Sequence, residues 1–504
     1  MVSRNKRIAT NTAFLYIRML LIMTIQFFTV RITLKYLGVV DYGIYNVVCG
    51  VTNVFTFLTH TMTSASQRFL AYDLGIGDKV QLKRTFDTLV SLFCICALVG
   101  VLLLGIIGTW FIHSYLVIPP ERLDAALFAF YFTLFALFVS IYVLPYNSLI
   151  IAHEEMKAFA YISILDALLK LGVVYCLVIV SVDKLKLYSA LTFVAYLIPS
   201  ILYIGYCYKK YDEVTLKSDV EWSLSKKIVP FMSWNLLGGL SWMLCTQGLS
   251  ILINMFFGPV ANAAKAIADK VNGSINGFSN NFMMAVQPQV VKTYAVGDYD
   301  AMHKVIYLAS RMSFFLMMVL TLPIFFNADG ILSLWLEKHD NLTTIMLQTV
   351  LSFSLISALE VPINQAIRAT GNIRNYQLYI GFVTLLVIPL AALLFYMKMP
   401  AYYGYVALIV IYGIAYIFRL YYLKKQIKVS YKQYFGKVLR PCILSILIAV
   451  GVCWIFKLCP YLKDIPVLVG YFGELLMVFV IIVLVGLNKE ERTLIKKIIK
   501  QKIR

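Results

Sequence analysis

The sequence predicts an all-α membrane protein that crosses the bilayer about fourteen times. Its composition, the regular alternation of long apolar runs with short polar breaks, and the uneven charge of those breaks support this fold class. Hydrophobic residues make up 61% of the 504 positions and charged residues only 14%, whereas a soluble chain carries about a quarter charged residues. With a mean hydropathy of +0.80, the chain cannot cover its apolar surface with polar side chains, so we expect lipid to be its solvent.

The apolar runs have the length that membrane helices require, which is roughly 20 residues. Charges, glycines and prolines divide the chain into fourteen stretches: 12–36, 44–70, 86–113, 124–150, 158–181, 187–208, 229–256, 262–290, 305–327, 343–367, 376–397, 402–423, 436–458 and 465–487. The second and eighth stretches are the most polar. The first does not have the pattern of a cleaved signal peptide, because its apolar run is too long and Arg18 interrupts it.

The connections between these stretches differ in positive charge. With the N-terminus placed inside, the inside segments carry 29 Lys and Arg residues and the outside segments carry 8. The positive-inside rule therefore predicts that both termini are cytoplasmic. This bias accounts for most of the net charge of +20, so nucleic-acid binding is not expected, although basic tails could contact anionic membrane lipids.

Signals for enzymes, metals and cofactors are absent from the sequence. There is no G-x-x-x-x-G-K-[ST] loop and no H-E-x-x-H motif. The nine cysteines are scattered, mostly inside apolar runs, and we interpret them as packing residues. We therefore predict a protein that is not an enzyme and takes no cofactor or metal. Without such a loop, any energy that the protein uses would come from an ion gradient, the membrane potential or the gradient of the molecule on which it acts.

The two halves of the chain carry matching polar, glycine and proline residues, most of them 220 positions apart. The pairs include Gly38 with Gly258, Gln67 with Gln287 and Gly77-Asp78 with Gly297-Asp298, and a three-residue slip then aligns Pro145 and Asn147 with Pro362 and Asn364. This pattern indicates an internal duplication. Gly38 and Gly258 would let the chain reverse tightly between the first two helices of each repeat.

Each repeat holds six predicted spans. Because six is even, both copies enter the membrane in the same direction, as parallel repeats facing each other across a central space. The predicted organisation is an N-terminal six-helix lobe at 1–208, a cytoplasmic linker at 209–227, a second six-helix lobe at 228–424, two further helices within 436–487, and a basic cytoplasmic tail at 488–504.

Two stretches carry a resemblance to a known family. LGVVDYGIYNVVCGVTNVF, with the Ser/Thr-rich run ending in SASQRFL, resembles the first helical hairpin of Wzx-type polysaccharide flippases, and LPYNSLIIAHEEMKAFAYISILDALLKL resembles their fourth and fifth helices. These flippases belong to the multidrug/oligosaccharidyl-lipid/polysaccharide exporter (MOP) superfamily. The resemblance covers most of the first half and reaches the second half mainly through the repeat.

The resemblance implies V-shaped lobes of the MATE type that work by alternating access. It also implies a polyprenyl-diphosphate-linked oligosaccharide as cargo, such as a repeat unit of O-antigen (lipopolysaccharide), capsule or exopolysaccharide. The location would be the bacterial inner membrane, with membrane lipids, a glycan polymerase and glycosyltransferases as candidate partners. Three alternatives remain open: a lipid II flippase, which shares the fourteen-helix count, a multidrug exporter of the same fold, and an integral glycan polymerase.

Cationic residues inside the predicted spans are the candidates for binding the diphosphate. Ionisable groups within a bilayer are costly unless they are paired or hydrated, and they mark function by default. Arg18 lies about two turns into the first span, where it either faces a cavity or reaches back to the membrane surface. Arg31 and Arg68 lie nearer to span ends, where reaching the surface is the stronger alternative.

Two pairs of opposite charge have the spacing that places side chains on one helix face. Asp166 and Lys170 lie deep in the fifth span and are candidates for charge balance and substrate binding, or else for a structural salt bridge. Lys265 and Asp269 repeat the pattern near the outer end of the eighth span.

Acidic residues within the predicted spans, and the two most polar spans, complete the set of candidates. Glu360 lies beside Pro362 in the tenth span and could carry a coupling ion or bond to a neighbouring helix. The role of Glu474 cannot be assigned from the sequence. The hydroxyl and amide residues of the second and eighth spans suit either helix packing or the walls of a hydrated channel.

Overall fold

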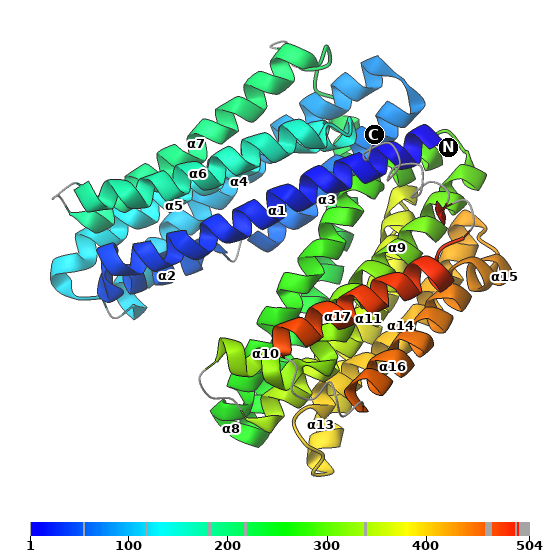
Figure 1. Ribbon diagram of the computed structural model, residues 1–504. Coiled ribbons are helices and arrows are strands. Elements are labelled where there is room, and N and C mark those ends of the chain that lie inside the picture. Colours follow the sequence, from blue (N-terminus) through cyan, green and yellow to red (C-terminus); the bar gives the residue numbers. More distant parts are fainter. Residues whose placement is uncertain are drawn as a thin grey trace, which may run out of the picture. The chain divides into compact units, whose positions relative to one another are not determined.

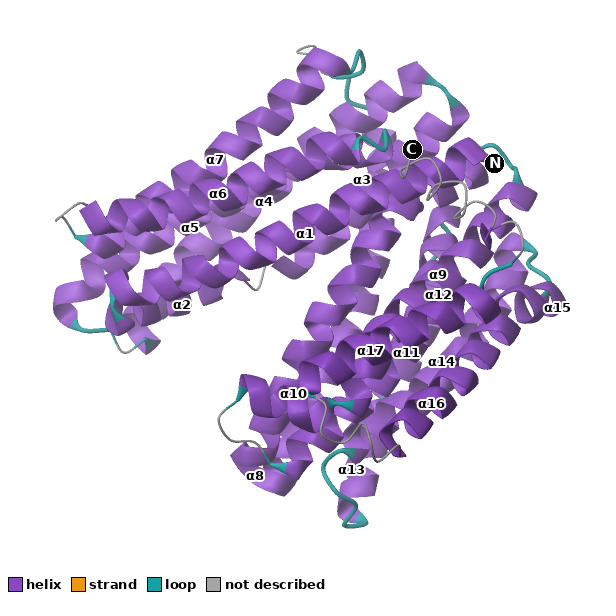
Figure 2. Ribbon diagram, viewed as in Figure 1, coloured by secondary structure: helices purple, strands orange, loops and turns teal. Residues whose placement is uncertain are grey.

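The computed structural model describes residues 2–53, 56–116, 118–179, 183–215, 219–336, 340–458, 466–488 and 491–492. Within these ranges every regular element is a helix (Figures 1 and 2). The predicted all-helical fold class is therefore confirmed.

The helices follow one another along the chain with short connections (Figure 1). Their bounds are α1 Val2–Leu37, α2 Val39–Asn53, α3 Thr56–Ile76, α4 Lys79–Tyr115, η1 Pro120–Arg122, α5 Leu123–Ala152, α6 Met156–Ile179, α7 Lys184–Lys210, α8 Trp222–Ala295, α9 Tyr299–Phe326, α10 Ala328–Trp335, α11 Asn341–Thr370, α12 Arg374–Leu385, α13 Val387–Tyr396, α14 Tyr403–Ile427, α15 Tyr431–Tyr434, η2 Phe435–Leu439, α16 Arg440–Leu458, α17 Val467–Ile481 and η4 Ile482–Gly486.

Twelve helical segments in the described part are long and apolar enough to cross a membrane. They account for the predicted stretches except at two places. α8 counts as one helix of 74 residues, but Gly258 inside it has φ 80° and ψ −175°, so the helix is broken between the seventh and eighth predicted stretches. The second predicted stretch contains α2, of 15 residues, and α3, which is rich in Thr and Ser; residues 54–55 between them lie outside the described part.

The helices form two compact units. Unit 1 contains Met1–Leu236 and Tyr294–Val296, and unit 2 contains Leu237–Thr293 and Gly297–Arg504. The chain thus changes unit inside α8, after the predicted linker at 209–227.

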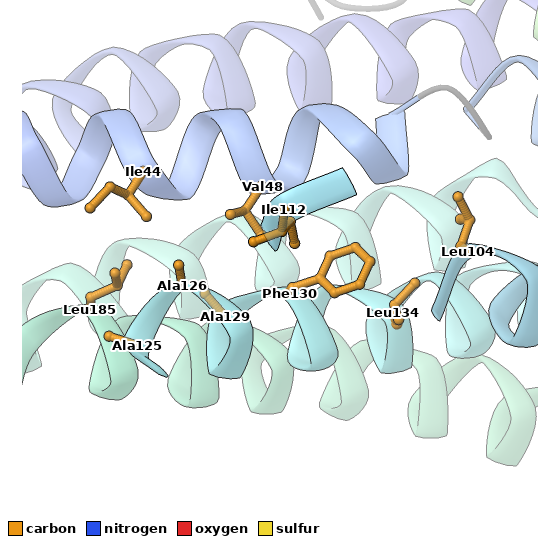
Figure 3. Packing of buried hydrophobic residues seen from close by; sticks show 10 residues of the cluster. All are labelled: Ile44, Val48, Leu104, Ile112, Ala125, Ala126, Ala129, Phe130, Leu134 and Leu185. Atoms are coloured by element: carbon orange, nitrogen blue, oxygen red, sulfur yellow. The ribbon is translucent and has the colours of Figure 1, made fainter. Parts of the chain in front are cut away.

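α5 is the central helix of unit 1, where it packs against α2, α3, α4 and α7. Close approach is possible because three buried alanines, Ala125, Ala126 and Ala129, lie near the start of α5, among side chains of α2, α4 and α7 (Figure 3). Small side chains are what allow membrane helices to approach closely. On α4, Gly108 leaves room for the ring of Phe130, since an added Cβ would lie 2.3 Å from that ring.

α9 and α11 are the central pair of unit 2. α11 packs against α9 and α14, and the C-terminal helices α16 and α17 both pack against α9. Glycines again set the contacts: Gly330 on α10 faces Val467, and Gly486 faces the ring of Phe315 on α9. The two C-terminal helices are therefore packed onto the body of unit 2.

Matching glycines of the two halves all have positive φ. Gly38 and Gly258 have φ of 84° and 80°, and Gly77 and Gly297 have φ of 84° and 72°. This left-handed region favours glycine because it has no Cβ. Gly38 and Gly258, which the sequence predicts at tight reversals of the chain, thus both have a φ that favours glycine.

The helix that follows Gly77 and the helix that follows Gly297 begin in the same way. The Asp78 carboxylate accepts a hydrogen bond from the Gln81 amide at 3.0 Å, and the Asp298 carboxylate accepts one from the Ala301 amide at 2.9 Å. Each aspartate therefore caps the start of its helix, α4 or α9. These shared caps support the proposed duplication.

Candidate functional site

Unit 1 contains a cavity of about 600 Å³ among α1, α2, α3, α5, α6 and α7. Its charged lining residues are Arg18, Asp166 and Lys170. The other polar lining residues are Gln26, Tyr45, Thr52, Thr59, Thr133, Ser140, Asn147, Ser163, Thr192, Tyr196, Ser200 and Tyr203. The cavity thus combines a small number of charges with many hydroxyl and amide groups.

Asp166 and Lys170 form an ion pair on α6, with Lys170 Nζ 2.7 Å from Asp166 Oδ2. Their side chains are 30% and 35% exposed, so both reach the open space of the cavity. Lys170 Nζ also lies 4.7 Å from the centroid of the Tyr196 ring on α7. The ring face and the carboxylate together hold this ammonium group at the cavity wall.

Arg18 enters the same cavity from α1. Its guanidinium carbon lies 4.6 Å from the centroid of the Phe159 ring on α6, and α1 and α6 pack against each other along their length. Stacking on an aromatic face holds the planar guanidinium while its N–H groups remain donors. The structure therefore places Arg18 at the cavity rather than at the end of its helix.

The hydroxyl groups of the lining are partly used by the protein. Ser163 Oγ and Tyr203 Oη lie 3.0 Å apart, and the Thr133 and Ser140 hydroxyls donate to carbonyls of their own helix. A hydroxyl that donates inward keeps lone pairs with which it can accept from a bound molecule. The lining has one more cation than carboxylate, so its charge and donors suit a polar anion.

Of the other predicted substrate-binding residues of unit 1, Arg68 lies elsewhere and Arg31 is not described. Arg68 on α3 stacks against rings of its own unit, with its guanidinium carbon 4.6 Å from the Phe69 centroid and 4.9 Å from the Tyr72 centroid. It is not part of the cavity lining. Arg31 falls within α1, but its side chain lies outside the part of the chain that the structure describes.

Lys265 and Asp269 form the second predicted pair, in unit 2. Lys265 Nζ lies 2.7 Å from Asp269 Oδ2, and the Tyr405 hydroxyl donates to Asp269 Oδ1 at 2.7 Å. The Lys265 side chain is only 6% exposed, whereas that of Asp269 is 42% exposed. The carboxylate thus screens a buried ammonium from solvent.

Glu360 forms a buried ion pair that crosses between helices of unit 2. Arg419 Nη1 on α14 lies 2.8 Å from Glu360 Oε1 on α11, and both side chains are under 5% exposed. Arg419 Nε also donates to Asn364 Oδ1 at 3.2 Å, and this oxygen accepts the hydroxyl of Tyr376 as well. Arg419 was not among the sequence candidates, although an arginine inside an apolar run is a signal that could have indicated it.

Glu474 is fully buried on α17 and connects the C-terminal helices to α9. Asn327 Nδ2 donates to Glu474 Oε2 at 2.8 Å, and Asn327 Oδ1 accepts from Lys457 Nζ of α16 at 2.7 Å. The amide of Asn327 therefore bridges an acid and a base that are 4.0 Å apart. This contact supplies the structural role that the sequence did not reveal.

The tyrosines of the cavity, Tyr45, Tyr196 and Tyr203, were also missed by sequence reasoning. They come from α2 and α7, and nothing in the spacing of the 34 tyrosines of the chain distinguishes these three. Which tyrosines face a cavity depends on how each helix is rotated in the bundle.

Comparison with known proteins identifies the fold. Residues 240–393 match the MatE family model. A MATE transporter in its bent conformation superimposes with a TM-score of 0.73 at 14% identity, over 84% of this chain and 96% of that chain. A point mutant of MATE gives 0.72 at 14% identity, over 83% and 97%. The chain has the fold of the MATE transporters.

A third structure with this fold is a MOP superfamily transporter from Pyrococcus furiosus. It gives a TM-score of 0.70 at 14% identity, over 83% of this chain and 95% of that chain. The binding pocket of that transporter has reverse polarity, which suggests a different function for that protein. No curated protein matches the chain in sequence. The chain is therefore a multi-pass membrane protein with a fold found in transporters.

Proposed function

We propose that this protein is an exporter of the MOP superfamily that moves a polyprenyl-diphosphate-linked oligosaccharide across the bacterial inner membrane by alternating access. The cargo would be a repeat unit of O-antigen, capsule or exopolysaccharide. The observation that carries the proposal is the cavity of unit 1, in which Arg18 and Lys170 face a space surrounded by hydroxyl and amide groups.

The two parts of such a cargo match the two parts of this lining. A diphosphate is bound best by guanidinium and ammonium groups, and arginine can contact two of its oxygens at once. Sugar hydroxyls are bound by many weak donors and acceptors, which the Ser, Thr, Tyr, Asn and Gln side chains provide. Lys170 would turn from Asp166 toward the diphosphate, and Asp166 would then balance the remaining charge.

The other predicted binding and coupling residues extend this proposal. Arg68, Arg31 and Lys265 remain candidates for contacting the cargo along its path, and Glu360 and Asp269 for charge balance or ion coupling. The MatE match makes a multidrug exporter an equally good assignment at the level of the fold. An organic cation, however, needs a cavity with excess acid, and the lining described above has excess base. A lipid II flippase would need the same diphosphate chemistry.

The test is complementation of a flippase-null bacterial strain with variants at matched expression. We expect R18A to reduce surface glycan at least about tenfold, because a charge-assisted hydrogen bond contributes about 1.5–3 kcal/mol. R18K should retain an intermediate level. K157A is the control, because it also removes one cation of unit 1, but Lys157 is exposed at the start of α6 and is not among the cavity-lining residues.

Two results would contradict the proposal. If the strain that expresses R18A carries as much surface glycan as the strain that expresses the wild-type protein, Arg18 has no part in the mechanism. Failure of the wild-type protein to restore any glycan, together with export of organic cations from cells that express it, would favour the multidrug assignment instead.

A further inference from the structure

The end of α14 and the start of α16 carry a concentrated positive charge. Six exposed cations lie within 17 residues and define what we call the basic surface: Lys424, Lys425, Lys428, Lys432, Lys437 and Arg440. No Asp or Glu occurs anywhere from position 361 to position 463. The local sequence therefore offers no carboxylate to neutralise this charge.

The tertiary structure of the described residues does not neutralise it either. Among the described residues, no carboxylate forms an ion pair with a residue of the basic surface. The ammonium groups instead lie near aromatic rings: Lys424 Nζ is 4.7 Å from the Tyr431 centroid, Lys437 Nζ is 5.4 Å from the Tyr307 centroid, and Lys425 Nζ is 5.9 Å from the Tyr421 centroid. A ring face does not accept all three N–H bonds of an ammonium group, so these lysines keep donors for a further acceptor.

In unit 1, by contrast, several cations near helix ends form ion pairs. These cations are paired with carboxylates: Arg7 with Glu154 at 3.0 Å, Lys210 with Glu155 at 2.7 Å, Arg84 with Asp219 at 3.3 Å and Lys79 with Asp212 at 3.5 Å. Orienting a membrane helix requires cations but does not require that they stay unpaired. The orientation of the helices in the membrane therefore does not explain why the cations of the basic surface are unpaired.

Aromatic side chains alternate with these cations. The rings of Tyr421, Tyr431 and Phe435 are 51%, 44% and 54% exposed, whereas Tyr434 and Val438 are buried. The short turn formed by α15 and η2 is therefore amphipathic, with buried residues that fix it to unit 2 and exposed rings on its other side. Aromatic rings prefer the boundary between hydrocarbon and headgroups.

We propose that the basic surface binds the headgroups of anionic phospholipids at the cytoplasmic boundary of the membrane. The proposal rests on the orientation assumed in the proposed function. Lysines close to an anionic leaflet are attracted to it, and the attraction falls off within a Debye length. Six cations spread over several helical turns match a group of lipid phosphates better than the single diphosphate of one cargo molecule.

The experiment measures lipid preference of the purified full chain by native mass spectrometry, with phosphatidylglycerol or phosphatidylcholine added to the detergent solution. We expect the wild-type protein to retain phosphatidylglycerol preferentially. In the variant K424Q/K428Q/K432Q/K437Q, the preference for phosphatidylglycerol over phosphatidylcholine should fall at least about tenfold. The corresponding four-arginine variant should keep it, because it keeps the charge.

A matched control separates clustering from net charge. K157Q/K226Q/K227Q/K304Q also removes four exposed lysines, but from three separate places in the chain, and it should keep most of the preference. A salt series on the wild-type protein needs no variant: between 0.1 M and 1 M salt the Debye length falls from about 10 Å to about 3 Å, and the preference should fall with it.

The outcomes distinguish this proposal from the proposed function. Equal phosphatidylglycerol preference in the wild-type and four-glutamine proteins, an equal loss in the control variant, or insensitivity to salt would each overturn it. So would a wild-type protein that shows no preference between the two phospholipids. Restoration of surface glycan by the wild-type chain tests the transport function separately, whatever the lipid result.

Discussion

At the scale of single residues, His153 connects three parts of unit 1. Its ring Nε2 lies 2.6 Å from Glu213 Oε1, and the ring stacks on Tyr211 with centroids 4.1 Å apart. Its backbone carbonyl accepts a hydrogen bond from Arg7 at 2.7 Å. Burial alone would raise the pKa of Glu213, but the hydrogen bond with His153, a backbone hydrogen bond and the nearby charges of His153 and Lys79 together outweigh it, so that the pKa is lowered from its usual value.

The lowered pKa of Glu213 predicts a pH-dependent stability. A carboxylate whose pKa is lower in the folded state stabilises the fold above its unfolded-state pKa of about 4.3, and this contribution is lost as the pH falls through the folded-state value. We expect E213Q to reduce the free energy of unfolding at pH 7 by about 1.5–3 kcal/mol. Thermal unfolding of the purified protein across pH should show this difference shrinking in acid.

Asp212 provides the matched control for Glu213. It is the preceding residue and its side chain is 90% exposed, so D212N should change stability little at any pH. A deficit of E213Q that is the same at pH 3 and pH 7 would show that the contact with His153 does not depend on the charge of Glu213.

At the scale of elements, glycines decide where helices are broken and where they continue. Gly258 has a conformation, φ 80° and ψ −175°, that is almost restricted to glycine. Gly273 lies later in α8 with ordinary helical geometry, and an added Cβ would have no heavy atom within 4 Å. The same substitution should therefore have opposite effects at the two positions.

We expect G258A to destabilise the protein by about 1–3 kcal/mol and G273A to stabilise it by about 0.5–1 kcal/mol. Thermal or denaturant unfolding of the two variants under the same conditions measures both. A neutral G258A would mean that the break in α8 does not need the left-handed backbone.

The Glu360–Arg419 pair is a second feature at this scale, because it joins α11 to α14. Removing one partner leaves a buried charge without compensation, so E360A should cost about 3–5 kcal/mol. The double variant E360L/R419M removes both charges and should recover most of that loss. Unfolding measurements on the three proteins test this.

The same double variant separates packing from ion coupling. If Glu360 carries a coupling ion, E360L/R419M will fold like the wild-type protein but will not restore surface glycan in the flippase-null strain. If the pair only holds the two helices together, the stable double variant will also restore surface glycan.

At the scale of the whole molecule, the charge distribution predicts the orientation in the membrane. Reporter domains fused after Asp183, between α6 and α7, and after Lys428, at the end of α14, should report opposite compartments, with the second one cytoplasmic. Alkaline phosphatase, active only outside, and green fluorescent protein, fluorescent only inside, give complementary readings. The same compartment at both positions would contradict the predicted number of crossings between them.

Much of the fold could be predicted because it depends on local sequence. The length of each apolar run reflects the thickness of the bilayer, and the breaks at Gly38 and Gly258 reflect a backbone conformation open to glycine. The pairs Asp166–Lys170 and Lys265–Asp269 followed from four-residue spacing on one helix.

The sequence by itself determined that the solvent is lipid, where most helices lie, and which charges share a helix face. Only the tertiary structure decided which distant residues meet: Arg18 with the Asp166–Lys170 pair, Arg419 with Glu360, and Asn327 with Glu474 and Lys457. The physical reason is that lipid and protein neighbours are both apolar, so hydropathy does not tell which face of a membrane helix points inward. That rotation is set by the packing of complete helices, and with it the position of every polar side chain in the cavity.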